Sequence, residues 1–496
     1  MMTDIPVETL IQGCEAEKLH LSGAIQSFGA LLRLDAATLC VTHISANLVE
    51  WLGPAAHQLL GQPIESSGWL SRAAFEKLPP QPGGCIALAH LFNCSVGSVD
   101  AVIIRADDAI LVELECHDQA AEPIPFQQFQ RPLLSVPYDE QELLRQHDTL
   151  LAAFRIITGY DRVMLYRFHE DWSGEVIAEA ASPALGSYLG LHFPASDIPA
   201  IARNLYMLNP ARLIPDIQAA PVTLLGSASG APNLTWSGLR SVSPVHLQYL
   251  AHMGIGASFS VPIRIANRLW GLVACHHLTP RMLTYDQRQA CVNLTNAYAL
   301  SVTSYLASRR LQAIDSLDRR IDRVLEALAN FGDPLDGIEP NATLLMDVLD
   351  AQGFAMAVGD DVVIAGAGPD TEGMSLIDGW FLNECKESIA STSRLEALFP
   401  GQLHILAVAS GMVAVKARSP RSGWVRFYWF RPAEPQEVAW AGNPNKPLVE
   451  NAGVVMLSPR RSFERWVEIR NGYSRPWNSE EKMTAAKFRN TLLRWL

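Results

Sequence analysis

The heptapeptide CHHLTPR, at residues 275–281, gathers one thiol and two imidazoles at the end of an apolar run. Cys275, His276 and His277 could ligate a metal, form a cysteine–histidine nucleophile pair, or bind the polar groups of a ring-shaped ligand. The preceding run, LWGLVAC, indicates a buried strand. Neighbouring side chains on a strand point to opposite faces, so the three cannot all face one ion. A metal site here is therefore disfavoured, and the other two possibilities stay open.

The remaining cysteines add no metal or redox motif. The eight cysteines of the chain form no CxxC pair, and zinc sites need clustered ligands at short fixed spacing. In a reducing compartment we expect free thiols that pack as small apolar side chains. An enzyme with a Cys275–histidine pair would also need an oxyanion-binding glycine motif, which the residues beside Cys275 lack. We predict neither a metal site nor a catalytic residue.

A second concentration of polar side chains lies in the 80 or so residues before His276. Asp197, in PASDIP, precedes a predicted helix and could simply cap it. It is followed by several arginines, serines, tyrosines and histidines: Tyr206, Arg212, Arg240, Ser243, His246, Tyr249, Ser258 and Ser260. Paired arginines suit two carboxylates of a ligand, because the guanidinium fork binds a carboxylate through two hydrogen bonds. Tyrosine and histidine suit an aromatic heterocycle with N–H and C=O groups.

Composition limits the remaining possibilities. The chain has 496 residues, 49% of them hydrophobic and 18% charged, which indicates a globular protein of more than one domain. The net charge of −12 and the scattered basic residues disfavour nucleic acid as a partner. No apolar run approaches the ~18–20 uncharged residues of a membrane helix, and the N-terminus lacks a signal-peptide pattern. We expect no membrane partner and a cytoplasmic location.

The pattern of apolar residues predicts an α+β protein with three antiparallel-sheet domains and a long helix. Short alternating runs such as GALLRLD, DAVIIRAD and AILVELECH indicate strands in the first 130 residues. A helix over 139–159 leads into a second set, including DRVMLYRF, GASFSVPIRI and RLWGLVACHH. Residues 286–330 contain neither Gly nor Pro and repeat apolar residues at three- and four-residue steps, which predicts one long helix. Mixed helix and strand then return.

Three groups of motifs resemble one family. PASDIP, LRSVSPVHLQYLAHMGIGASFS and LWGLVACHH resemble the chromophore-binding GAF domain of phytochromes. GCEAEKLHLSGAIQSFGALLRL is similar to the PAS segment of bacteriophytochromes, and WAGNPNKP and PRRSFERWVEIRNGYSRPW resemble the tongue of their PHY domain. The resemblance covers nearly the whole chain. It implies a PAS domain over 1–130, a GAF domain over 131–310, and a PHY domain over 311–496 with a tongue at about 435–480. It also implies a knot in which the segment around Ile25 passes through the loop at 222–238.

The same resemblance implies a covalently bound biliverdin, a linear tetrapyrrole. The thiol is expected to be Cys14, because Val245 stands where related proteins carry a cysteine before the residue matching His246. The Asp197 carbonyl, with a water held by His246, is expected to accept from the pyrrole N–H groups, and His276 to bind the ring D carbonyl. The other implied contacts are Arg212, Arg240, Ser243, Ser258 and Ser260 for the propionates, Tyr166, Tyr188, Phe193, Tyr206 and Tyr249 around ring D, and Ile198.

Signalling is expected to run through the tongue. The resemblance implies isomerisation between rings C and D, and an ion pair between Arg460 and Asp197, with Ser462 and Ser474 as further signalling residues. SFERWVEIR fits both a helical and a strand period, which favours a segment that can switch between the two. Two departures from the family are expected to affect switching. Ser27 and Phe28 replace Pro and His beside the knot, and Ala441 replaces a glycine that could adopt positive φ.

The expected function is that of a red/far-red light photoreceptor module. Such a chain is expected to form a homodimer through helices of its GAF and PHY domains, and to signal to a response regulator or an output domain. Because FRNTLLRWL ends the sequence without a phosphoacceptor helix or ATP-binding boxes, a histidine kinase output would lie beyond Leu496. The alternative from a different class is a light-independent small-molecule sensor that uses the same pockets.

Overall fold

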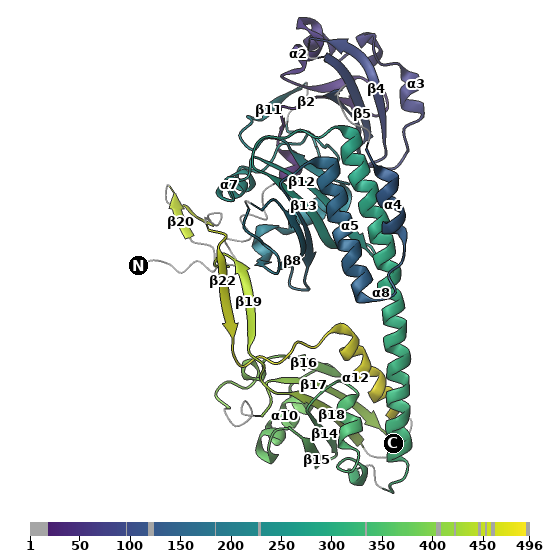
Figure 1. Cartoon of the computed structure of the whole chain (residues 1–496), viewed down its shortest axis with the longest axis vertical. Helices are drawn as coiled ribbons and strands as arrows, with labels where there is room; N and C mark the ends of the chain where they lie inside the picture. The colour runs from purple at the N-terminus through teal and green to yellow at the C-terminus, as the bar shows by residue number, and fades with distance from the viewer. Residues whose placement is uncertain are drawn as a thin grey trace. The chain divides into compact units, whose positions relative to one another are not determined.

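The structure is a computed structural model, and it describes most of the chain in two compact units. The described residues are 18–95, 97–117, 124–183, 185–226, 230–332, 335–402, 408–420, 423–444, 448–451, 454–457 and 462–492. The first unit comprises Met1–Tyr305 and Ala439–Trp466, and the second comprises Leu306–Val438 and Val467–Leu496. Figure 1 labels their elements.

The first domain is a seven-stranded sheet with short helices. The strand order is β1-β11-β3-β2-β6-β5-β4. The bounds are β1 Ala24–Ile25, β2 Gly29–Asp35, β3 Val41–Ser45, β4 Cys85–Cys94, β5 Gly97–Arg105, β6 Ala109–Cys116 and β11 Val222–Gly226. The helical elements are η1 Leu19–Leu21, α2 Leu48–Leu52, η2 Pro54–Leu59, η3 Ile64–Ser67 and α3 Arg72–Glu76. One face of the sheet packs with α2 and α3 into an apolar core.

Strand β11 of the first domain comes from a later part of the chain and pairs with β1 and β3. The excursion 222–241 holds the N-terminal segment on both sides: Leu224 N donates to Gly23 O (3.0 Å), and Ser241 N donates to Ala24 O (3.1 Å). These contacts are those that the predicted knot would require at the segment around Ile25. Phe28, one of the two departures from the family motif, is partly buried and packs against the cores on both sides of the crossing.

The middle domain is built on an eight-stranded sheet of order β10-β12-β13-β7-β8-β9-β19-β22. The bounds are β7 Arg162–Phe168, β8 Gly174–Ala181, β9 His192–Phe193, β10 Arg212–Ile214, β12 Ala257–Ile265, β13 Arg268–His277, β19 Gln436–Ala441 and β22 Arg465–Arg470. The helices are α4 Phe126–Leu134, α5 Glu140–Thr158, η4 Ala195–Asp197, α6 Ala200–Leu208 and α7 Pro244–His252. α5 begins where the Asp139 side chain accepts from Glu142 N, and ends at Gly159 with φ 62°.

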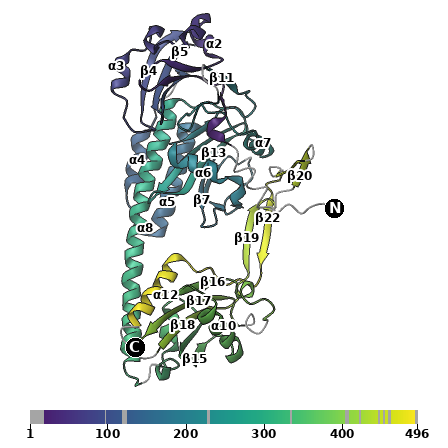
Figure 2. The ribbon, with the colours of Figure 1, turned by 180° about the vertical axis from the view of Figure 1, so that it is seen from behind.

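The predicted long helix is α8, Tyr285–Leu328, with 44 residues. Its first part lies beside α5 on one face of the middle sheet, in both ribbon views (Figures 1 and 2). There Ser301 Oγ donates to Gln146 Oε1 of α5 (3.0 Å). Its last turns supply Leu317 and Ile321 to the core of the second unit. Between them Leu311 is 64% exposed, which leaves an apolar side chain in solvent.

The second unit contains a five-stranded sheet of order β15-β14-β18-β17-β16 with a core on each face. The strands are β14 Gly353–Val358, β15 Asp361–Gly366, β16 Ile389–Thr392, β17 Gly411–Ser419 and β18 Gly423–Arg431. The helical elements are η5 Leu335–Gly337, α9 Ala342–Asp347, α10 Thr371–Asn383, η6 Leu395–Ala397 and α12 Ser479–Leu492. β20 Leu448–Asn451 and β21 Val454–Leu457 form a separate two-stranded sheet. Among the described residues, no helix combines the length and apolarity needed to cross a lipid bilayer.

Candidate ligand pocket

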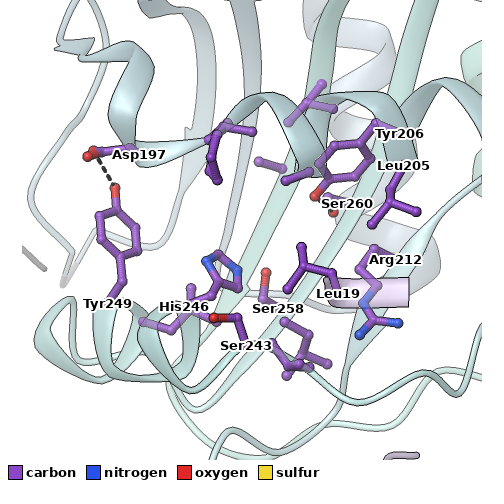
Figure 3. Close-up of a pocket in the computed structure, with 18 of the residues that line it drawn as sticks. Leu19, Asp197, Leu205, Tyr206, Arg212, Ser243, His246, Tyr249, Ser258 and Ser260 are labelled. Carbon is purple, nitrogen blue, oxygen red and sulfur yellow. Dashed lines mark hydrogen bonds between the residues drawn. The ribbon is translucent and has the colours of Figure 1, made fainter. Parts of the chain in front are cut away.

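A cavity of about 250 Å³ lies in the middle domain, and most of the predicted site residues line it. Figure 3 shows side chains from α6, α7, β10 and β12 converging on it. The predicted residues in its lining are Tyr166, Phe193, Asp197, Ile198, Tyr206, Arg212, Arg240, Ser243, His246, Tyr249, Ser258, Ser260 and His276. The structure therefore brings together residues that are scattered over about a hundred positions of the sequence.

Strand alternation explains the cluster at residues 275–277. His276 lines the cavity, whereas Cys275 lies fully buried in the core on the opposite face. Burial raises the pKa of the Cys275 thiol well above its usual value, so it is a poor nucleophile. His277 faces away from the cavity and its Nδ1 lies 2.7 Å from Asp161 Oδ2. His276 thus faces the cavity, whereas Cys275 and His277 point to the opposite face, as the alternation of a strand predicts.

Neighbouring strands align the polar wall of the cavity. Ser258 is in register with His276 across β12 and β13, and Arg212 is in register with Ser260 across β10 and β12. The Ser260 hydroxyl lies 2.7 Å from the hydroxyl of Tyr206 on α6. Because β12 and β13 are paired on both sides and β10 is paired with β12, backbone hydrogen bonds fix this wall.

The two arginines of the pocket donate only to backbone carbonyls. Arg212 donates to the carbonyls of Arg240 (2.5 Å) and Ser241 (3.0 Å), and Arg240 to those of Leu234 (3.2 Å) and Thr235 (3.0 Å). Within the described part of the chain, neither guanidinium forms an ion pair with a carboxylate. Burial lowers the pKa of Arg212 to about 10 and that of Arg240 to about 9. Buried cations are costly unless paired, so this wall favours an anionic ligand.

Asp197 does not cap the following helix. α6 begins at Ala200 with Pro199 as its N-cap, and no side chain caps it. The simple capping interpretation of Asp197 is therefore wrong. Instead, Asp197 Oδ2 accepts a hydrogen bond from the Tyr249 hydroxyl at 3.1 Å, drawn as a dashed line in Figure 3.

The two histidines of the cavity are held neutral. Burial, with Arg212 as the second cause, lowers the pKa of His246 to about 4. Burial also lowers the pKa of His276 to about 3, with further contributions from Arg162 and His246. At pH 7 each ring therefore offers one N–H donor and one acceptor to a ligand.

Aromatic rings close the far end of the cavity. Tyr166 and Phe193 pack together with centroids 5.9 Å apart, and both line it. Tyr188 lies outside the lining residues and one ring further away, edge-on to Phe193 at 6.0 Å and beneath the guanidinium of Arg162 at 4.0 Å. Its expected contact with a ligand is therefore indirect in this structure.

The predicted signalling residues Ser462 and Ser474 belong to different units of the structure. In the first unit, the carbonyl of Ser462 lies where a side chain on Gly442 would clash. Ser474 belongs to the second unit and is buried there, donating from its backbone N–H to Ser393 O (2.9 Å). SFERWVEIR contains a strand here, Arg465–Arg470. Cys14 and Arg460 lie outside the described residues.

Ala441 does not need the positive φ that the family's glycine could adopt. Ala441 is not among the residues with positive φ, whereas the next residue, Gly442, has φ 81°. The glycine needed for the turn is thus present one position later, and Ala441 is fully buried.

Sequence reasoning missed the apolar part of the cavity wall. It includes Leu19 of the N-terminal segment, Met164 and Val176 of the sheet, and Leu205 of α6. Met164 and Val176 alternate with core residues on their strands, which could have indicated a second buried face. No sequence pattern indicates Leu19, because its position at the cavity depends on where the N-terminal segment meets the excursion at 222–241.

Three family models match the chain in the order of its domains. The PAS fold matches residues 14–117, the GAF domain matches 142–302, and the phytochrome region, PHY, matches 317–496. The chain belongs to the phytochrome family and comprises its PAS–GAF–PHY photosensory module.

Individual relatives agree with this assignment. A bacteriophytochrome of Xanthomonas campestris pv. campestris is 32% identical over 94% of this chain and 75% of its own length. Cyanobacterial phytochrome B of Nostoc sp. is 32% identical over 99% of this chain, which spans 66% of that protein's length. A solved bacteriophytochrome from the photosynthetic bacterium R. palustris has a TM-score of 0.82 and 32% identity, with coverage of 97% of this chain and 98% of that one.

Proposed function

We propose that the chain is a red/far-red photosensory module that binds biliverdin in the cavity of its middle domain. The observation that carries this proposal is a pair of guanidinium groups at the cavity, Arg212 and Arg240, which form no ion pair with a carboxylate among the described residues. A ligand with two carboxylates and a conjugated heterocyclic body satisfies both the guanidinium pair and the aromatic wall. When bound, the pigment supplies light absorption and an isomerisable double bond.

The chain's own residues provide binding and orientation. Arg212 and Arg240, which line the cavity, are proposed to bind the two propionates, with Ser243, Ser258 and Ser260 as further hydrogen-bonding groups. The neutral ring of His276 can donate to a carbonyl, and His246 can hold a water beside the Asp197 backbone. Leu19, Met164, Val176 and Leu205 add an apolar surface to the lining.

Covalent attachment is proposed at Cys14. Leu19 lines the cavity, and five residues of extended chain reach up to about 17 Å. The chain length between Cys14 and Leu19 therefore allows the Cys14 thiol to reach the cavity. The described thiols on the middle sheet and α8, Cys275 and Cys291, are buried in the opposite core with raised pKa values. They are unsuited to attack on a ligand.

Signal transfer is proposed through the tongue. Phe463 packs on Tyr249, which contacts Asp197, so a change in ligand pose can reach the segment. SFERWVEIR supports a strand here and has the period of a helix as well. We propose that light converts one into the other, with an Arg460–Asp197 pair favouring one state.

We propose that the complete protein signals through a separate output domain of the histidine kinase type, and that it forms a dimer through α5 and α8. Support for the dimer is the exposure of Leu300 (62%), Leu306 (41%) and Leu311 (64%) along α8. Leu300 and Leu311, about three turns apart, fall on one face of the helix, and apolar side chains exposed on one face suit a helical interface.

The absorption spectrum of the chain assembled with biliverdin tests the function. We expect a far-red or red band that shifts reversibly on illumination. A light-independent small-molecule sensor would use the same pocket without photoconversion. A pigment that binds without a reversible shift would therefore favour that alternative.

A further inference from the structure

Two imidazoles and a carboxylate meet on the sheet face opposite the ligand cavity. Glu175 and His192 are in register across β8 and β9. Their neighbours Val176 and Phe193 line the cavity, so strand alternation places Glu175 and His192 on the other face. His169 follows β7, in a turn where its N–H donates to Ser173 O at 2.8 Å.

The spacing of these groups suits a metal ion. One ligand atom from each of His169, Glu175 and His192 lies within 4.8 Å of the other two. His169 Nε2 lies 3.3 Å from Glu175 Oε2, and ligands of a tetrahedral zinc ion stand about 3.3–3.4 Å apart. The ligand atom of His192 lies within 4.8 Å of the other two, so a rotation of its ring is enough to bring it to this spacing.

The chemistry of the donors also points to a metal. His169 Nε2 is buried, and its contact with Glu175 does not have hydrogen-bond geometry. Two imidazoles and a carboxylate are typical zinc ligands, and a fourth position stays open for water.

We propose that His169, Glu175 and His192 form a site for a first-row divalent transition ion, with Zn²⁺ as the best match. Arg167 competes with the ion, because its Nη2 lies 3.4 Å from the same Glu175 oxygen. Its side chain is 41% exposed and can turn into solvent. The site is therefore partly blocked by a displaceable cation.

The site adjoins the first strand of the tongue. His192 pairs with Trp440 in the parallel contact between β9 and β19, and their rings lie edge to face with centroids 5.8 Å apart. An ion that fixes the His192 ring stabilises the surface against which Trp440 packs. Zinc is thus expected to favour pairing of β19 with β9. This consequence rests on the proposed role of the tongue, whereas metal binding does not.

Calorimetric titration of the pigmented protein with Zn²⁺ in the dark tests the site. We expect His169→Ala and His192→Ala each to weaken one binding event by about tenfold or more. Arg167→Ala should strengthen the same event, because it removes the competing cation. His57→Ala, which changes an exposed histidine of the first domain, is the matched control. Thiols and pigment are common to all variants, so differences report on this site.

Equal titrations for the wild type and all three variants would overturn the metal site and leave a histidine–glutamate contact.

Hydrogen exchange tests the link to the tongue. Zn²⁺ should slow exchange of residues 436–441 in the wild type and leave it unchanged in His192→Ala. Zinc binding without slower exchange would overturn the stabilising effect on β19 while supporting the site. Neither measurement requires photoconversion, so failure of the light-sensor proposal is separately visible.

Discussion

The ring of Phe463 stands edge-on to the ring of Tyr249, with centroids 5.1 Å apart and planes at 88°. Phe463 belongs to the tongue and is 9% exposed, whereas Tyr249 lines the cavity and donates to Asp197. The two rings make direct physical contact between the ligand site and the segment proposed to switch. Tyr249 makes both the ring contact with Phe463 and the hydrogen bond to Asp197. Mutations can remove either contact and leave the other.

Phe463→Ala should loosen the tongue without changing pigment attachment. Loss of a buried aromatic ring costs about 3–5 kcal/mol where the site cannot collapse. We expect faster hydrogen exchange in residues 462–470 and an altered rate of dark reversion. Tyr249→Phe is the companion variant, since it keeps the ring contact and removes only the hydrogen bond to Asp197. Exchange and reversion like those of the wild type in Phe463→Ala would exclude this contact from signalling.

Cys14→Ala should abolish covalent attachment of biliverdin. The measurement is zinc-induced fluorescence of the pigment on a denaturing gel, where only a covalently bound pigment stays with the chain. Cys85→Ala, which removes an exposed thiol of β4, should leave the fluorescent band intact. A band retained in Cys14→Ala would transfer the attachment to another cysteine.

Arg240→Met should weaken biliverdin binding through the lost pairing with a carboxylate. A hydrogen bond to a charged group is worth about 1.5–3 kcal/mol, which corresponds to about ten- to a hundredfold in affinity. The dimethyl ester of biliverdin, which lacks the two negative charges, provides the matched ligand. We expect the substitution to affect the ester much less than the free acid in an equilibrium binding assay. Equal losses for both ligands would show that Arg240 supports the loop rather than the propionates.

Glu113→Gln should change how stability depends on pH. Burial raises the pKa of Glu113 to about 7, although Ser237 donates to its Oε1 at 2.5 Å. The unfolded chain releases this proton near pH 4.5, so the folded state loses stability as pH rises from about 4.5 to about 7. The loss amounts to roughly 3 kcal/mol at most.

Thermal unfolding of both proteins at pH 5 and pH 8 provides the measurement for Glu113. We expect a smaller decrease in melting temperature between these pH values for the glutamine variant. Equal decreases would assign the pH dependence to other groups.

The sequence predicted those features that depend on periodicity or on long motifs. The alternation at 272–277 correctly separated His276 from Cys275, and the absence of Gly and Pro over 286–330 predicted α8. Asp197 was ambiguous, because a carboxylate before a helix has the same local pattern whether it caps the helix or contacts a distant tyrosine. The cluster of His169, Glu175 and His192 was missed, because it depends on strand register between β8 and β9, which spacing along the chain does not reveal.

Strand β11 has a consequence for how such proteins can be divided or recombined. Residues 222–226 complete a sheet whose other strands end at Cys116, and the excursion that carries them encloses residues 20–26. A fragment ending near residue 130 would leave β1 without its partner and one side of β3 unpaired. The first two domains therefore have to be kept together when parts of related proteins are exchanged. Chimeras between related proteins should fold only when the junction lies within or after α8.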